Sequence, residues 1–268
     1  MSAEFVCNIC GKENNIYEPF NREFTRTACC NSSPRMRMIV HVLSMELFGK
    51  SLALPNFPER NIKGIGISDW EGYAIPLAAK LNYTNTYYHK EPRLDIANVS
   101  ESWKGKYDFV ICSDVMEHVE PPVLRGFQGL SDLLKPGGVV IFSVPYMYEC
   151  GYQEYYPNLY KYKIVEIDGQ KVLKNVTRDG NEEEFTNLWL HGGDGAVLAM
   201  RLYTEQKLAE DFLAVGFNDM KIYRAYMPFG AFWPESYSQL WAVRKASQNL
   251  QKPKHGRRWL NWPRFLRL

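Results

Sequence analysis

The alternation of strand-like and helix-like segments between residues 61 and 145 constrains the fold more than any other feature of this sequence. Short apolar runs with strand character occur at residues 61–67, 85–89, 107–113 and 139–145. Segments with helical spacing of apolar residues separate them, at residues 73–81 and 123–134. Such alternation predicts an α/β domain with a parallel sheet and helices on both faces. Ligands of such sheets bind at the carboxyl ends of the strands.

Three further regions flank this alternating segment. Residues 1–50 hold four of the six cysteines and then a helix-like run. The α/β domain is expected to span 51–245, with an irregular, tyrosine-rich insertion at 146–200 that we expect to cover the ligand site. Within the insertion, residues 161–176 form two strand-like runs around Asp168–Gly169, which predicts a hairpin. Two closing strands are expected within residues 216–226 and 236–245.

Charge is distributed unevenly along the chain, whose net charge is +2. Residues 244–268 carry eight Lys or Arg and no acid, so residues 1–243 carry 24 basic and 30 acidic side chains, a net charge of −6. An acidic body argues against a nucleic-acid partner, which needs a basic face. The basic and aromatic tail at 246–268 has the composition of a peripheral membrane contact, or is a solvated terminus.

The ends of the chain and its cysteines bear on the compartment. The first ten residues have neither the basic nor the apolar part of a secretory signal, and no apolar run is long enough to span a membrane. We therefore expect a cytoplasmic protein, where thiols stay reduced. The six cysteines are then expected to be metal ligands or buried thiols rather than disulfides.

Residues 108–145 carry the most specific motif. Asp108 opens a strand, Glu117–His118 follows it, and Leu134–Gly138, with the sequence LKPGG, leads into the next strand. Together these features resemble the second half of class I S-adenosylmethionine (SAM)-dependent methyltransferase domains, especially the type 11 group that acts on small molecules and glycans. The resemblance implies a Rossmann-like, seven-stranded, mostly parallel sheet with SAM as the cofactor.

The same resemblance assigns the cofactor site, although the first half of the motif matches less well. The acid of the family's glycine-rich loop is replaced by Gly64, and Ser68 and Trp70 stand where later glycines are usual. Glu91 is expected at the ribose and Asp95 at the adenine amino group. The full set of expected cofactor residues is Gly64, Gly66, Ser68, Glu91, Asp95, Ser113 and Asp114.

Methyl transfer from SAM requires mainly that the acceptor atom is aligned with the methyl group. A hydroxyl acceptor also benefits from a general base that removes its proton. His118 follows the strand at 107–113, and His191 stands at the end of the insertion. Asp114 is a third candidate base. Each histidine also has a purely structural interpretation: His118 as a helix cap or packing residue, and His191 as a loop residue bonded to backbone.

The N-terminal cysteines form a second motif. Cys7 and Cys10 have the spacing of half a tetrahedral zinc site, and the adjacent Cys29 and Cys30 are expected to complete it. The segment also resembles an N-terminal Cys-x2-Cys … Cys-x2-Cys-x-Ser-x2-Arg-x-Arg leader of certain methyltransferases, with Thr27 at one expected Cys. The alternative is an empty, reduced cysteine cluster. Arg35 and Arg37, which follow it, suit either a phosphate or sugar nucleotide, or surface ion pairs.

These observations favour an O-methyltransferase acting on a sugar or another small-molecule or glycan hydroxyl. Two alternatives remain: methylation of a protein or nucleic acid, or a catalytically inactive, zinc-stabilised binding module. The departure of residues 64–72 from the family pattern motivates the last alternative.

Overall fold

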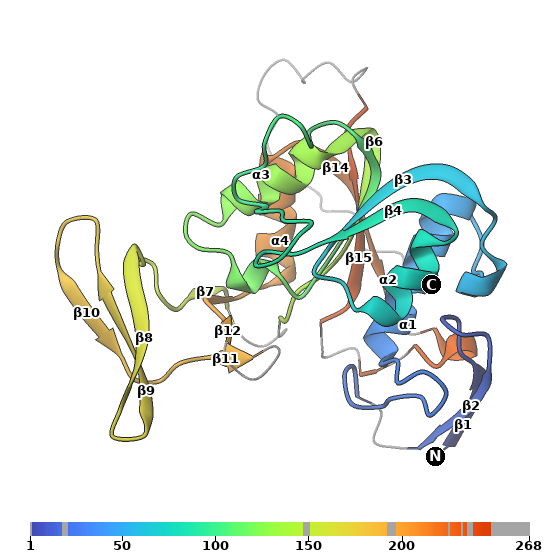
Figure 1. Cartoon of the computed structure of the whole chain (residues 1–268), viewed down its shortest axis with the longest axis horizontal. Coiled ribbons are helices and arrows are strands. Elements are labelled where there is room, and N and C mark those ends of the chain that lie inside the picture. The colour runs from blue at the N-terminus through green and yellow to red at the C-terminus, as the bar shows by residue number, and fades with distance from the viewer. Residues whose placement is uncertain are drawn as a thin grey trace, which may run out of the picture.

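The computed structural model describes residues 2–17, 21–146, 151–191, 197–224, 226–231, 233–234 and 238–247. Its centre is one twisted sheet with the strand order β14-β15-β6-β5-β3-β4 (Figure 1). The strands are β3 (Arg60–Ile67), β4 (Leu81–Thr86), β5 (Tyr107–Ser113), β6 (Leu134–Ser143), β14 (Phe217–Tyr223) and β15 (Leu240–Lys245). The four strands from β4 to β6 run parallel, and β15 is antiparallel to both of its neighbours. The predicted Rossmann-like α/β fold is confirmed.

Two details of the prediction are corrected. Within the described residues the sheet has six strands rather than seven. Among the described residues no edge strand forms next to β4, and the chain after β4 contains a turn in which Asp95 accepts a hydrogen bond from the Ala97 amide at 2.9 Å. The strand expected at 85–89 also lies earlier, at Leu81–Thr86, where Leu81 and Tyr83 alternate into the core.

Four helices cover the sheet, two on each face (Figure 1). They are α1 (Pro34–Phe48) and α2 (Glu71–Ala78) on one face and α3 (Leu124–Leu133) and α4 (Glu205–Ala214) on the other. Successive residues of β5 alternate between the two cores: Phe109 packs with the first pair of helices and Val110 with the second. Both faces of β5 are therefore buried, as its continuous apolar sequence predicts.

Two motif residues hold the amino ends of the strands. Asp108 accepts hydrogen bonds from the Lys63 amide at 2.8 Å and from Lys135 Nζ at 2.6 Å. These contacts join β3, β5 and β6 at the edge opposite to the one where ligands bind. Asp108 and the Lys135 of the LKPGG segment therefore serve the sheet rather than a ligand.

The N-terminal element packs beside α1. It contains β1 (Ser2–Val6) and β2 (Glu13–Tyr17), paired antiparallel, and the short helices η1 (Leu54–Asn56) and η4 (Met227–Phe229) lie nearby. Ser33 caps α1 by accepting a hydrogen bond from the Met36 amide, and Gly49 ends it in a left-handed conformation. Arg37 is completely buried, and its Nη2 donates to the Gly230 carbonyl at 2.7 Å. The element is thus tied to the segment that precedes β15.

The insertion between β6 and α4 forms small antiparallel sheets. The largest contains β8 (Lys161–Ile167), β9 (Gln170–Val176) and β10 (Glu182–Phe185) and projects from the body, opposite the N-terminal element (Figure 1). Its turn at Asp168–Gly169 confirms the predicted hairpin. The shorter strands are β7 (Gln153–Glu154), β11 (Leu190–His191), β12 (Val197–Leu198) and β13 (Arg201–Leu202). No helix in the described part of the chain is long and apolar enough to cross a membrane.

Candidate active site

A cavity of about 930 Å³ opens at the carboxyl ends of β3, β5 and β6. Its volume lies in the range of small-molecule and cofactor pockets. Three parts of the chain line it: the sheet through Ser68, Asp69 and Asp114, the N-terminal element through Arg22 and Arg35, and the insertion through Tyr155 and Trp189. The β8–β9–β10 sheet does not line this cavity. Among the described residues, the part of the insertion that lines the cavity is therefore its base.

Charged side chains from two regions meet in the cavity wall. Arg22 binds Asp114 with two hydrogen bonds of 2.8 Å, and Arg35 Nε lies 3.3 Å from the same carboxylate. Glu23 accepts from Arg22 at 2.8 Å and from Arg35 at 2.6 Å, while Ser143 donates to Asp114 at 2.9 Å. Burial alone would raise the pKa of Asp114, but the two guanidinium groups outweigh it and hold the pKa well below its usual range. Asp114 is thus ionised and a poor proton acceptor near neutral pH.

Two non-glycine residues beside the cavity have left-handed backbones. Ser68 follows β3 with φ of 59° and Asp114 follows β5 with φ of 54°. Backbone hydrogen bonds hold both, from the Ser68 amide to Thr86 O at 2.7 Å and from the Asp114 amide to Ser143 O at 2.9 Å. Such conformations cost about 1–2 kcal/mol and cluster at functional sites.

Asp69 is a site residue that the sequence reasoning missed. It is buried in the cavity wall and accepts hydrogen bonds from the hydroxyls of Tyr83 and Tyr73. Burial raises the pKa of this carboxyl to about 7. The available signal was an acid directly after Ser68, in the loop that lacks the family's usual acid.

His118 lies in the short helix η2 (Met116–His118) and lines the cavity. Its Nδ1 donates to the Leu198 carbonyl at 2.8 Å, which links β5 to the insertion. Its Nε2 lies 3.7 Å from Oε1 of Glu117. Glu117 is fully buried, and neither of its oxygens has a hydrogen-bond partner among the described residues. Burial and the charge of Asp114 raise the pKa of Glu117 well above its usual value.

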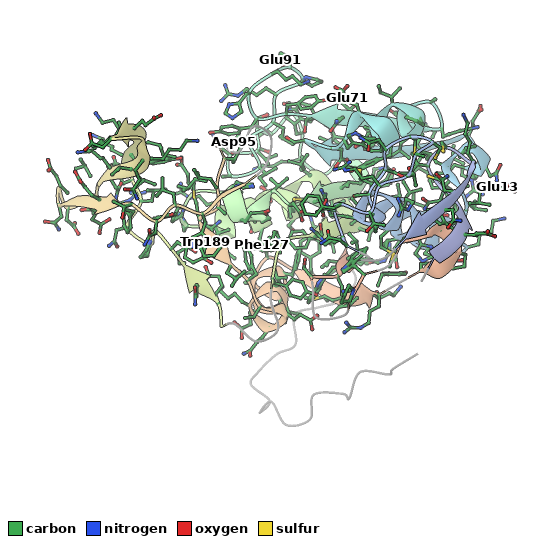
Figure 2. All side chains as sticks on the ribbon, turned by 90° about the horizontal axis from the view of Figure 1, so that it is seen from below. Glu13, Glu71, Glu91, Asp95, Phe127 and Trp189 are labelled. Carbon is green, nitrogen blue, oxygen red and sulfur yellow. The ribbon has the colours of Figure 1, made fainter. Side chains whose placement is uncertain are left out.

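Aromatic side chains border the other end of the cavity. The Tyr155 and Trp189 rings stack with centroids 5.6 Å apart and planes 11° apart. Trp189 remains 60% exposed although it lies in the cavity wall (Figure 2). Phe24, from the N-terminal element, also lines the cavity and is 82% exposed. Exposed rings of this kind offer flat apolar faces to a ligand.

Comparison with protein families decides what kind of enzyme carries this site. A family model described as a methyltransferase domain matches residues 10–222. The chain belongs to this methyltransferase family. It is a SAM-dependent methyltransferase, and the match begins at Cys10, within the N-terminal element, and includes β3, β4, β5 and β6 of the sheet.

Solved structures show distant likeness to this methyltransferase, and curated proteins show none. The Burkholderia thailandensis 1,6-didemethyltoxoflavin-N1-methyltransferase is 15% identical with a TM-score of 0.44, over 79% of this chain and 78% of that chain. A SAM-bound amino pentose methyltransferase from Micromonospora echinaspora is 12% identical, with a TM-score of 0.43 over 79% and 90%. A methyltransferase from Clostridium acetobutylicum is 13% identical, with a TM-score of 0.43 over 77% and 97%. No curated protein matches the sequence. These distant likenesses add nothing to the assignment from the family.

The cavity of the methyltransferase fits its cofactor in size and in charge. SAM carries a carboxylate, an ammonium and a sulfonium, and the wall offers two guanidinium groups together with the carboxyl groups of Glu23, Asp69 and Asp114. Of the cofactor residues expected from the sequence, Ser68, Ser113 and Asp114 line the cavity. Ser113 accepts a hydrogen bond from Arg35 Nη1 at 2.7 Å.

The other expected cofactor residues of the methyltransferase lie elsewhere. A Cβ on Gly64 would come within 2.0 Å of the Phe109 ring, and one on Gly66 within 1.9 Å of the Tyr83 hydroxyl. Packing within the protein therefore already accounts for both glycines. Glu91 is exposed at the outer end of its loop, and Asp95 lies nearer the main body (Figure 2). Neither lines the cavity, and their contacts with the cofactor stay predictions.

His191 is described only in its backbone, which pairs with Val197 between β11 and β12. The prediction that its side chain acts as a base lies outside the described residues. Arg37, which the sequence suggested for a phosphate or an ion pair, instead donates from its buried guanidinium to the carbonyls of Ser32 and Gly230.

The four N-terminal cysteines of the methyltransferase meet at one point. The sulfur atoms of Cys7, Cys10, Cys29 and Cys30 all lie within 4.8 Å of one another, and all four thiols are free. Individual pairs are 3.6 Å apart (Cys7–Cys30), 3.7 Å apart (Cys29–Cys30) and 3.0 Å apart (Cys10–Cys29). A tetrahedral zinc with bonds of about 2.3 Å needs sulfurs about 3.8 Å apart. The cluster can hold a metal ion, and the adjacent cysteines both reach it.

Proposed function

We propose that this methyltransferase transfers the methyl group of SAM to a hydroxyl of a sugar or another small-molecule or glycan acceptor. The observation that carries the proposal is His118, whose imidazole stands in the cavity wall just past β5. It lies between the charged end of the cavity, with Asp114, and the insertion, which bears the aromatic end. A base at this place suits a hydroxyl acceptor, which must lose its proton.

His118 is held in the form that a base requires. Because Nδ1 donates to the Leu198 carbonyl, the neutral ring carries its lone pair on Nε2. Bound SAM supplies an activated methyl group on its sulfonium. Nε2 of His118 would take the proton of the acceptor hydroxyl, and the methyl group would leave the sulfonium for the hydroxyl oxygen, so that S-adenosylhomocysteine and the methylated acceptor remain. The Leu198 carbonyl keeps the ring oriented and stabilises the imidazolium that results.

The other predicted bases take different places in this proposal. Asp114 serves as the ionised partner of Arg22 and Arg35, because its low pKa makes it a poor base. His191 stays a second candidate that can orient the acceptor from the insertion. Burial and the charge of Asp114 raise the pKa of Glu117, whose Oε1 lies 3.7 Å from His118 Nε2.

The aromatic end of the cavity supports an acceptor with a flat, weakly polar face. The exposed face of Trp189, backed by Tyr155, suits the apolar side of a sugar ring. The net charge of −6 over residues 1–243 disfavours nucleic acid.

We further propose that the four N-terminal cysteines bind one structural zinc. Their sulfur separations suit tetrahedral coordination by thiolates. We also propose the cytoplasmic location that was expected from the sequence. The peripheral membrane contact expected of the basic tail stays a prediction, because residues 248–268 lie outside the described part of the chain.

The first test measures cofactor binding and methyl transfer separately. Calorimetry with S-adenosylhomocysteine should show binding to the wild type, and the absence of binding at millimolar concentration would instead favour the inactive binding module. Transfer of a labelled methyl group from SAM is then measured over panels of sugars, sugar nucleotides, glycans, proteins and RNA. Transfer only to protein or only to RNA would show that the protein is a protein or nucleic-acid methyltransferase rather than a small-molecule or glycan methyltransferase.

The second test concerns the base. With an acceptor in hand, His118→Ala should lower kcat by about 10² to 10⁴ while leaving the affinity for S-adenosylhomocysteine nearly unchanged. His89→Ala is the matched control, since His89 is exposed in the loop after β4. Normal turnover and stability in His118→Ala would remove His118 as the base.

A further inference from the structure

Two arginines from outside the sheet reach the carboxyl ends of β5 and β6. Arg22 lies in the loop between β2 and α1 and meets Asp114, 92 residues further along the chain. Arg35, in the first turn of α1, reaches Ser113 at 2.7 Å. With Glu23 and Asp114 they form a group of two positive and two negative side chains, which we call the arginine cluster. The cluster is neutral as a whole and lines the cavity.

The cluster is built like a binding site rather than a closed ion pair. Arg22 is only 8% exposed, yet its Nε has no hydrogen-bond partner among the described residues. A buried donor without a partner costs about 1–3 kcal/mol, and native proteins contain few of them. The Arg35 side chain keeps 17% of its surface exposed in the cavity wall. Both guanidinium groups thus stand next to space that a ligand can occupy.

The chemistry of the cluster matches one end of SAM. The methionine end of the cofactor carries an α-carboxylate and an α-ammonium, so it needs cationic donors and an anionic acceptor side by side. Guanidinium groups bind carboxylates in forked pairs, and carboxylates bind ammonium. A zwitterion added to a neutral cluster leaves the buried charge balanced, whereas a lone anion or cation does not.

We propose that Arg22 and Arg35 bind the α-carboxylate of SAM, with Glu23 and Asp114 beside its ammonium group. The N-terminal element then supplies part of the cofactor site of the methyltransferase domain. This inference rests on the use of SAM and adds a role for residues that the sequence motif for the cofactor does not contain. The proposal also explains why two arginines line the cavity that is expected to bind the adenosine and methionine parts of SAM.

The test compares ligands that differ only at the methionine end. S-Adenosylhomocysteine carries both charged groups, decarboxylated SAM lacks the α-carboxylate, and 5′-methylthioadenosine lacks the whole amino-acid portion. In calorimetry, Arg35→Ala should weaken S-adenosylhomocysteine binding by about 10- to 100-fold. The same variant should bind decarboxylated SAM and 5′-methylthioadenosine with nearly wild-type affinity. Arg178→Ala is the control, since Arg178 lies on the insertion over the Tyr160 ring and outside the cavity.

Loss of a partner for Asp114 can also destabilise the fold, so Arg22→Lys and Arg35→Lys are tested in parallel. Lysine keeps the charge but not the forked geometry, and the same selectivity between ligands should appear in a folded protein. Equal loss of affinity for all three ligands, or none, in the folded variants would overturn the proposal. If the wild type binds none of these ligands, the use of SAM fails instead, which distinguishes the two outcomes.

Discussion

The two additions to the sheet, the N-terminal element and the insertion, differ in the side chains that they bring to one cavity, although Phe24 of the first and Arg201 of the second also line it. The N-terminal element brings Arg22, Glu23 and Arg35, which are charged and mostly buried. The insertion brings Tyr155 and Trp189, which stack on each other, with Trp189 largely exposed. A charged wall suits the ionic end of a cofactor, and an aromatic wall suits a neutral ring. This difference agrees with the proposals made above, in which the N-terminal element binds the methyl donor and the insertion binds the acceptor.

Each addition is anchored by a buried arginine, but the two arginines are neutralised differently. Arg201 binds Glu154 through two hydrogen bonds and donates to the Met116 carbonyl at 2.7 Å. Arg37 has no carboxylate partner among the described residues, and burial lowers its pKa to about 10. Among its neighbours, Cys7, Cys29 and Cys30 oppose the effect of burial on this pKa. Four thiolates around one zinc carry a net negative charge and would therefore serve as the counterion of Arg37.

Zinc removal is expected to have the largest effect on stability, and to destabilise the N-terminal element but not the insertion. Wild-type protein purified without chelator should contain one zinc per chain by elemental analysis. A strong chelator, or Cys30→Ser, should unfold the N-terminal element, since structural zinc binding contributes about 10 kcal/mol in small domains. Hydrogen exchange should then increase over residues 2–33 and stay unchanged over β8–β10. A fully folded preparation without metal would contradict the proposed structural zinc. Cys112→Ala is the control: Cys112 is buried in β5, away from the cluster, so this variant should retain the zinc.

The next effect concerns Asp69, which lies in the cavity between the two additions. Burial raises its pKa from 3.8 to about 7, so the folded protein holds this proton more tightly than the unfolded chain. The resulting contribution to stability is complete below about pH 4 and is lost as the pH rises through about 7. Over that window the wild type should lose on the order of 4 kcal/mol of unfolding free energy relative to Asp69→Asn. Urea unfolding at several pH values measures this difference, and parallel profiles for the two proteins would contradict it.

Asp95→Ala tests the part of the cofactor that neither addition contacts. If Asp95 accepts a hydrogen bond from the adenine amino group, its loss should cost about 1.5–3 kcal/mol of binding free energy. Unlike the arginine variants, Asp95→Ala should weaken S-adenosylhomocysteine and 5′-methylthioadenosine equally, because both contain adenine. An unchanged dissociation constant for both would remove Asp95 from the site.

Trp189→Ala should have the smallest effect and act on the insertion side alone. Loss of the exposed ring is expected to raise the KM of the acceptor by about 5-fold, corresponding to roughly 1 kcal/mol of aromatic contact. The affinity for S-adenosylhomocysteine should not change. Tyr160→Ala is the control, an exposed aromatic residue of the insertion outside the cavity. Weaker cofactor binding in Trp189→Ala would contradict the proposal that the insertion contacts the acceptor and not the cofactor.

The sequence by itself determined the local elements and the family. The apolar run at 107–113 became β5 with its predicted bounds, and Asp168–Gly169 became the turn of the predicted hairpin. The four clustered cysteines were also predicted as a set. These features are encoded by neighbours in the chain: strand periodicity, turn residues with positive φ, and short ligand spacings.

Only the tertiary structure decided which side chains meet in the cavity. Arg22 pairs with Asp114 across 92 residues, and Asp69 pairs with Tyr83 from the neighbouring strand. Arg35 was expected on the surface or at a phosphate, and Gly64 and Gly66 at the cofactor. Packing placed the arginine in the cavity and the glycines against Phe109 and Tyr83, and contact of the glycines with the cofactor stays a prediction. Such contacts depend on how helices and loops pack on the sheet, and no pattern of adjacent residues specifies that arrangement.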